Sequence, residues 1–130
     1  MEYVAVVTIL ALLEYMYFSI LVGQARVRYD IKAPAVSGHE VFERYFRIQQ
    51  NTIEQLIVFL PALWVFAYYV HAPTAAVLGL VFIAGRFIYQ LGYSKDPKKR
   101  GPGFGIGFLA IIVLTLGGLI GALVSVFSGS

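Results

Sequence analysis

The chain alternates long apolar runs with short polar stretches, and four of the runs are long enough to cross a membrane. A hydrocarbon core of ~30 Å needs roughly 20 residues of helix. We expect helices at residues 3–23, 40–70, 74–93 and 104–127. Short connections leave no room for a second folded unit, so the pattern predicts one all-α, four-helix integral membrane domain over residues 1–130.

The second predicted helix differs from the others because its first half carries a polar stripe. Spacings of three and four residues place five side chains on one helical face, namely Glu40, Arg44, Arg47, Asn51 and Glu54. Glu43 and Gln50 border this stripe. Ionisable groups at membrane depth are costly unless they face protein, water or a ligand. The stripe is therefore the candidate site.

The distribution of basic residues predicts the membrane topology. The basic residues of the first and third connections are Arg26, Arg28, Lys32, Lys95, Lys98, Lys99 and Arg100. The second connection and both chain ends have none, so the positive-inside rule places the first and third connections in the cytoplasm and both termini opposite. The polar stripe lies at the cytoplasmic end of the predicted bundle.

Composition excludes several classes of function. A hydrophobic content of 59% and a mean hydropathy of +0.78 exceed those of an ordinary soluble domain. The chain has no cysteine and only two histidines, so we expect no metal site and no cysteine nucleophile. Apolar runs separate the basic residues, which argues against a nucleic-acid-binding face. The sequence shows no Ser/His/Asp arrangement, so covalent catalysis by the protein is not indicated.

Two other groups of intramembrane polar residues each allow two interpretations. Glu14, near the middle of the first helix, is either functional or a structural carboxylate, protonated or hydrogen-bonded against a neighbouring helix; we favour the structural role, remote from the site. Arg86, Tyr89 and Tyr93 share one face of the third helix. They form either a polar pocket or part of an interfacial aromatic belt.

Glycine spacing predicts close helix packing at the fourth helix. Gly103 and Gly107 are four residues apart, as are Gly117 and Gly121. Such small-xxx-small pairs let helices approach closely in lipid. We expect them to serve packing within the bundle or an oligomer, and not nucleotide binding, because no strand precedes the glycine-rich segment.

The polar set at the cytoplasmic end combines arginines, a carboxylate, amides and tyrosines, which suits a small zwitterionic ligand with more than one carboxylate. The segments that carry these residues are YFSILVGQAR, FERYFRIQQNTIEQLIVFLPALWVFA and GLVFIAGRFIYQLGYSKDPKKR. They resemble the MAPEG family, the membrane-associated proteins in eicosanoid and glutathione metabolism. Within the family, they resemble the branch of microsomal glutathione transferase 2 and leukotriene C synthase.

This resemblance implies a homotrimer of four-helix subunits that holds its co-substrate, glutathione, between adjacent subunits. The implied glutathione contacts are Arg26, Arg47, Gln49, Asn51, Glu54, Tyr89 and Tyr93. Arg100 matches the arginine that stabilises the thiolate. The implied activity is a glutathione transferase or peroxidase that attacks lipophilic electrophiles or lipid hydroperoxides arriving from the bilayer.

Two positions depart from the leukotriene synthase pattern. Gln55 stands where that enzyme has a tyrosine, and Val27 stands where it has the second arginine of a pair. Arg28 points about 100° away from Val27 on a helix, so it does not simply replace that arginine. The second departure argues against specialised leukotriene synthesis.

Two alternative functions stay open at this point. One is a non-catalytic lipid-binding member of the family, resembling the five-lipoxygenase activating protein, although Arg47 together with Arg100 argues against it. The other is a small transporter that uses Glu14 as a proton-coupled site. Binding of glutathione by the purified protein separates both from the leading hypothesis.

Overall fold

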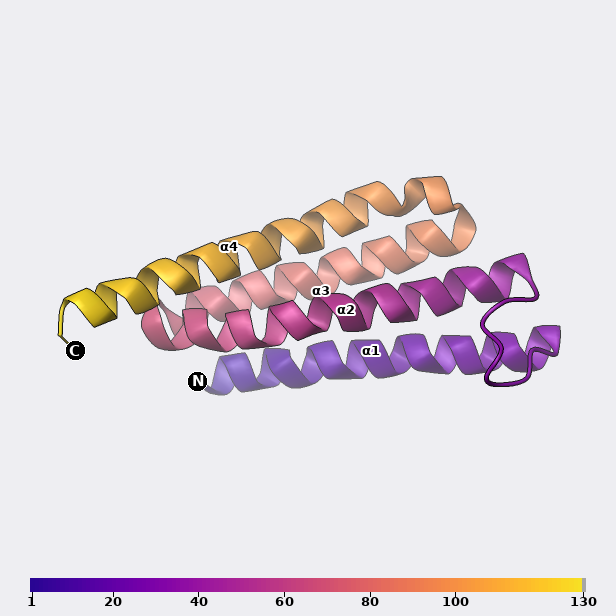
Figure 1. The fold of residues 1–130 in the computed structure, drawn as a ribbon, viewed down its shortest axis with the longest axis horizontal. Helices are drawn as coiled ribbons and strands as arrows, with labels where there is room; N and C mark the ends of the chain where they lie inside the picture. Colours follow the sequence, from indigo (N-terminus) through magenta and orange to yellow (C-terminus); the bar gives the residue numbers. More distant parts are fainter. Residues whose placement is uncertain (130) are drawn as a thin grey trace.

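The computed structural model describes residues 1–129 and forms a four-helix bundle with up-down-up-down connections (Figure 1). The elements are α1 (Glu2–Tyr29), α2 (Glu40–Tyr69), α3 (Ala72–Lys95), the short 3-10 helix η1 (Pro97–Arg100) and α4 (Gly101–Phe127). All four α-helices are long and apolar enough to cross a membrane. The predicted all-α architecture is confirmed, and both termini lie at the end opposite the first and third connections.

Three helices extend beyond their predicted bounds, and α3 does so by two residues at each end. α1 continues to Tyr29 because Arg26 and Arg28 lie in its last turn, where cations complement the helix dipole, and Asp30 ends it in the left-handed conformation. α4 begins at Gly101 and not at residue 104. Pro102 lies in its first turn, where the missing N–H has no helical partner to lose. The glycine-rich segment is therefore helical.

Both histidines cap helices. The His39 Nδ1 atom accepts a hydrogen bond of 3.1 Å from the backbone N–H of Val41 at the start of α2, and the ring stacks on Tyr29. The His71 Nδ1 atom accepts one of 3.3 Å from the backbone N–H of Thr74 at the start of α3. Each imidazole thus satisfies an N–H group that the helix leaves free.

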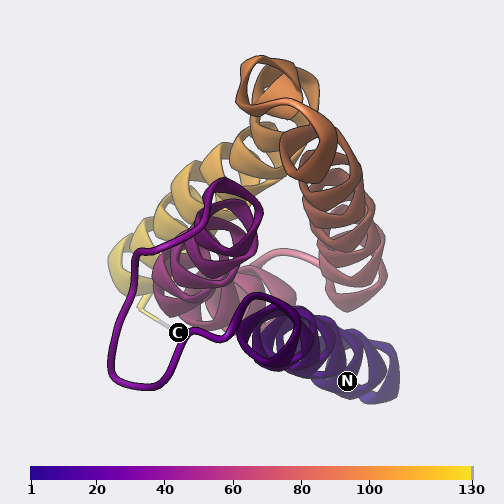
Figure 2. The same ribbon diagram turned by 90° about the vertical axis from the view of Figure 1, so that its right-hand side faces the viewer.

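The helices α2 and α3 form the centre of the bundle, and each packs against all three other helices (Figure 2). α1 and α4 lie on opposite sides of this pair. The main apolar core occupies the half of the bundle near the termini, where the rings of Phe59 and Phe82 stack with centroids 4.0 Å apart. The other half buries polar side chains, which are Glu14, Thr52, Arg86 and Gln90.

Glycines on α4 allow backbone-to-backbone contact with the central helices. A Cβ atom placed on Gly103 would lie 2.1 Å from the backbone nitrogen of Tyr89 on α3. Further along, a Cβ atom on Gly121 would lie 2.9 Å from the backbone oxygen of Tyr69 on α2, whereas one on Gly117 would lie 2.5 Å from the ring of Phe66. The packing predicted from the glycine spacing is confirmed within the bundle, and it brings the start of α4 against the polar half of α3.

Gly103→Ala is expected to destabilise the bundle because the backbone of Tyr89 cannot yield to the added methyl group. Overpacking of this kind costs about 1–3 kcal/mol. Gly105→Ala is the matched control, since nothing lies within 4 Å of a Cβ there and alanine favours a helix over glycine. Thermal unfolding in detergent, followed by circular dichroism, measures both. Equal midpoints for the two variants would contradict the proposed close packing.

Candidate functional site

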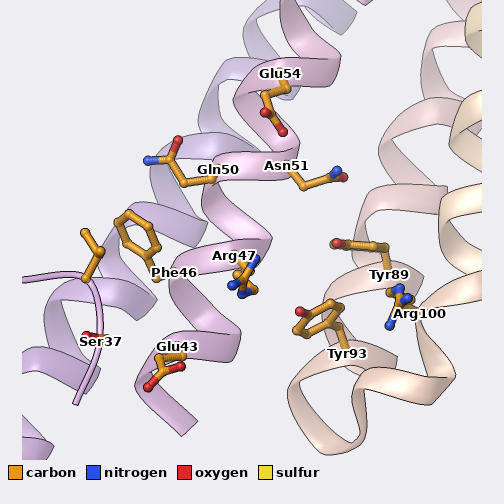
Figure 3. A pocket seen from close by; sticks show the side chains of 11 residues that line it. Ser37, Glu43, Phe46, Arg47, Gln50, Asn51, Glu54, Tyr89, Tyr93 and Arg100 are labelled. Atoms are coloured by element: carbon orange, nitrogen blue, oxygen red, sulfur yellow. The ribbon is translucent and has the colours of Figure 1, made fainter. Parts of the chain in front are cut away.

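A cavity of about 610 Å³ opens between α2 and α3 in the polar half of the bundle (Figure 3). The α1–α2 connection closes one side of it and the end of η1 another. Its lining residues are Val36, Ser37, Glu43, Phe46, Arg47, Gln50, Asn51, Glu54, Tyr89, Tyr93 and Arg100. The cavity lies where the polar stripe of the second helix predicted a site.

The α2 wall supplies the charged and amide groups of the cavity. Arg47, Asn51 and Glu54 come from the predicted stripe, and Glu43 and Gln50 come from its borders. Arg47, Gln50 and Glu54 are exposed within the single chain. Glu43 is tied to the α1–α2 connection, because its Oε2 atom accepts a hydrogen bond of 3.2 Å from the Gly38 N–H. The spacing of three and four residues in the sequence predicted that these side chains lie on one face of the helix.

Two residues of the predicted stripe serve the scaffold instead. Arg44 forms an ion pair with Glu40 one turn earlier. Its guanidinium also donates to the backbone oxygens of Ser94 and Lys95, at 3.4 and 3.2 Å. These bonds satisfy carbonyls at the C-terminal end of α3, which a helix leaves free. Arg44 therefore joins the start of α2 to the end of α3, on either side of the cavity.

The α3 wall is formed by the two tyrosines. Tyr89 and Tyr93 are 4% and 9% exposed, so they belong to the interior and not to a lipid-facing aromatic belt. Their rings lie 5.5 Å apart and point towards Arg47 and Asn51 (Figure 3). The polar-pocket interpretation of these tyrosines is confirmed. Two phenol groups thus face the charged stripe of α2.

Arg86, one turn before Tyr89, lies behind the cavity wall and not in it. The side chain is 1% exposed. Its Nη2 atom donates to the Asn51 Oδ1 atom at 2.8 Å and to the Thr52 Oγ1 atom at 2.9 Å. Helical spacing placed Arg86 on the face of the tyrosines. It could not show that this arginine reaches across to α2.

Arg100 lies at the junction of η1 and α4, on the rim of the cavity. Asp96 shapes the turn by accepting a hydrogen bond of 3.0 Å from the Lys98 N–H. The Arg100 Nη1 atom donates to the Pro97 oxygen at 2.9 Å, which holds the side chain over η1. Its backbone forms the N-cap of α4, whose dipole favours an anion at this end. The site therefore has two sources of positive potential beside Tyr93.

Arg26 and Gln49 do not line this cavity. Arg26 donates from Nη1 to the Ala35 oxygen at 2.8 Å and stacks over the Phe42 ring. Gln49 lies two positions from Arg47, about 200° around α2, and donates from Nε2 to the Ser19 Oγ atom at 2.9 Å. Within one chain, the structure brings together six of the eight predicted residues.

Glu14 is buried as predicted, at 3% exposure, between α1 and its neighbours. Neither carboxyl oxygen has a hydrogen-bond partner within residues 1–129, so of the two structural states predicted, protonated or hydrogen-bonded, the hydrogen-bonded one is not observed. Glu14 and Arg86 are both among the buried polar side chains of the bundle.

The charged groups of the cavity are not neutralised by one another. No ion pair within 4 Å joins Glu43, Arg47, Glu54 and Arg100 in the part of the chain that the structure describes. Two carboxylates and two guanidinium groups therefore face a shared space. Guanidinium forks bind carboxylates, and a carboxylate binds an ammonium group. The arrangement suits a zwitterionic ligand with several charged ends.

Four membrane-length helices around a charged cavity at one end of the bundle define a small multi-pass membrane protein with a polar cavity. A family model described as the MAPEG family matches residues 4–120. The chain belongs to this family and is an integral membrane protein.

Three relatives illustrate the similarity. An uncharacterized protein of Synechocystis sp. is 44% identical over 92% of this chain and 87% of its own length. Microsomal glutathione S-transferase 2 of Homo sapiens is 43% identical over 90% of this chain and 80% of its own. Leukotriene C4 synthase of Rattus norvegicus is 38% identical over 74% of this chain and 64% of its own length. The family predicted from the sequence is confirmed.

Proposed function

We propose that the protein is a membrane-bound glutathione transferase that binds glutathione in the α2–α3 cavity and activates it as a thiolate. The second substrate is a lipophilic electrophile or a lipid hydroperoxide. The single observation that carries the proposal is the convergence of Arg47, Asn51, Glu54, Tyr89, Tyr93 and Arg100 on one cavity. The glutathione transferase and leukotriene synthase among the relatives support the same class of reaction.

Glutathione carries charges that are complementary to those of the cavity. It is a tripeptide with two carboxylates, one ammonium group, two amide bonds and one side-chain thiol. Arg47 can bind a carboxylate through its fork, and Glu54 can bind the ammonium group. Asn51 and the tyrosines can bond to the amide backbone. In this proposal, these groups hold the peptide, and Gln50 and Glu43 border it.

Arg100 is assigned to the thiol. A free thiol has a pKa near ~8.5, so little thiolate is present at neutral pH. A guanidinium beside the sulfur favours the charged form and lowers that pKa, and the N-terminal dipole of α4 acts in the same direction. The thiolate then attacks an electrophilic carbon to form a carbon–sulfur bond, and the displaced group, or the electron pair of the attacked double bond or ring, takes up a proton from solvent at the open side of the cavity. With a lipid hydroperoxide, the thiolate attacks the outer oxygen and releases the lipid alcohol. The glutathione sulfenic acid then reacts with a second glutathione to give the disulfide and water. Proximity of the two substrates contributes the rest of the acceleration.

The proposed site is completed by an adjacent subunit. Arg47, Gln50 and Glu54 are exposed within one chain although they lie on a membrane-length helix. Exposed charges at membrane depth need a protein or water partner. In the proposed homotrimer, the neighbouring subunit covers this side and presents its Arg26 and Gln49 to the ligand. That assignment explains why these two residues lie outside the cavity of their own chain.

Arg100→Ala is expected to raise the pKa of the bound thiol towards ~8.5 and to slow turnover at neutral pH. Because the thiolate is the nucleophile, the rate should recover as the pH rises. Arg100→Lys should be intermediate, since it keeps the charge and loses the fork. The measurement is turnover against pH at saturating glutathione, with Lys98→Ala as the control in the same turn. A rate profile equal to that of the unmutated protein would remove Arg100 from the mechanism.

Arg47→Ala and Glu54→Ala are expected to weaken glutathione binding because each leaves a charged end of the ligand without its partner. A lost bond to a charged group costs about 1.5–3 kcal/mol, or roughly 10- to 100-fold in affinity. Calorimetry with glutathione measures the effect, and Lys32→Ala, in the α1–α2 connection, is the control. Unchanged affinity in both variants would show that glutathione does not bind in this cavity.

Subunit mixing tests the proposed interface. In the proposal, each site takes Arg47 from one subunit and Arg26 from its neighbour. Co-expressed Arg26→Ala and Arg47→Ala chains should therefore regain activity, because a mixed trimer contains interfaces where an intact Arg47 meets an intact Arg26. A pair of Arg47→Ala and Glu54→Ala chains is the control, since both changes affect the same half. Native mass spectrometry in detergent reports the trimer. Active monomers, or equal activity in the two mixtures, would contradict a shared site.

A further inference from the structure

A layer of buried polar side chains lies directly behind the cavity wall, and Arg86 is its centre. This guanidinium is enclosed by α2 and α3, and its side chain is among the largest fully buried ones. It bonds to Asn51 and Thr52 on α2 through one nitrogen. The proposed mechanism does not use Arg86. Its burial at membrane depth nevertheless carries a cost that calls for a compensating role.

Arg86 determines how Asn51 faces the cavity. A guanidinium has only donors, so the amide of Asn51 must direct its oxygen towards Arg86, at 2.8 Å. The amide nitrogen is then left for the cavity that Asn51 lines. Asn51 therefore presents donors to a ligand, and it fits a carbonyl or carboxylate oxygen.

The same guanidinium supports the opposite wall. The carbon atom at its centre lies 4.2 Å from the centroid of the Tyr89 ring, within the range of a cation–π contact. Tyr89 points from this contact towards the cavity and α2 (Figure 3). One side chain thus fixes a donor on α2 and a phenol on α3. The two walls of the cavity are oriented by a single buried charge.

Thr52 completes the positioning on the α2 side. Its hydroxyl donates to the Ile48 oxygen at 2.7 Å, which leaves a lone pair to accept the Arg86 bond at 2.9 Å. Both the donor and acceptor capacities of this buried hydroxyl are used. Arg86 therefore contacts groups that have no freedom to move away from it.

We propose that Arg86 is a positioning residue for glutathione, which orients the donors of Asn51 and the Tyr89 ring. This inference rests on the proposed function, because it assigns the residues that prepare the same cavity. It also gives Asn51 a defined partner on the ligand, a carbonyl or carboxylate oxygen of the peptide.

The test compares Arg86→Met with Asn51→Asp. Arg86→Met removes the donor to the Asn51 oxygen and the cation beside the Tyr89 ring, so glutathione affinity should fall about tenfold or more. Asn51→Asp keeps an oxygen for Arg86 but replaces the donor amide with an acceptor, so its thermal midpoint in detergent should be retained while its glutathione affinity falls. The loss should appear mainly in KM for glutathione.

The outcomes separate this inference from the proposed function. If the unmutated protein does not bind glutathione in calorimetry, the proposed function fails and the positioning role fails with it. If Arg86→Met and Asn51→Asp bind glutathione as tightly as the unmutated protein, Arg86 has only a structural role and the inference alone is overturned. If Arg86→Met does not fold, Asn51→Asp decides the question, because it leaves Arg86 in place.

Discussion

The cost of an ionised group in a low-dielectric bundle is the constraint on which this structure depends. α2 carries charges along a helix that also crosses the membrane, and each charge must find protein, water or ligand. Arg44 pairs with Glu40 and bonds to the end of α3. Arg86 bonds to Asn51 and Thr52. Arg47 and Glu54 are left to the cavity, where the proposed ligand site lies.

Regular features of the sequence predicted the fold and one wall of the site. Four apolar runs predicted four helices, and charges spaced three and four residues apart predicted the α2 face of the cavity. These predictions succeed because they depend on the helical period alone. Helix ends were less accurate, since the extension of α1 and the early start of α4 depend on local capping at Asp30 and Pro102.

Contacts between helices could not be predicted in the same way. The period placed Arg86 beside Tyr89, but its bonds to Asn51 depend on how far α2 lies from α3. Arg26 and Gln49 do not line the cavity. The angle at which each side chain leaves its helix accounts for this, but only once the location of the cavity is known.

Close packing by glycine connects the scaffold to the chemistry. Gly103 brings the start of α4 into backbone contact with α3 at Tyr89, so the turn that ends at Arg100 is held beside the tyrosine wall. The tyrosine is held from its other side by the Arg86 guanidinium. In the proposed mechanism, Arg100 stabilises a thiolate and must be held near the sulfur, because charge interactions weaken with separation. The glycine contact and the buried charge both position Tyr89 beside that turn, one through its backbone and the other through its ring.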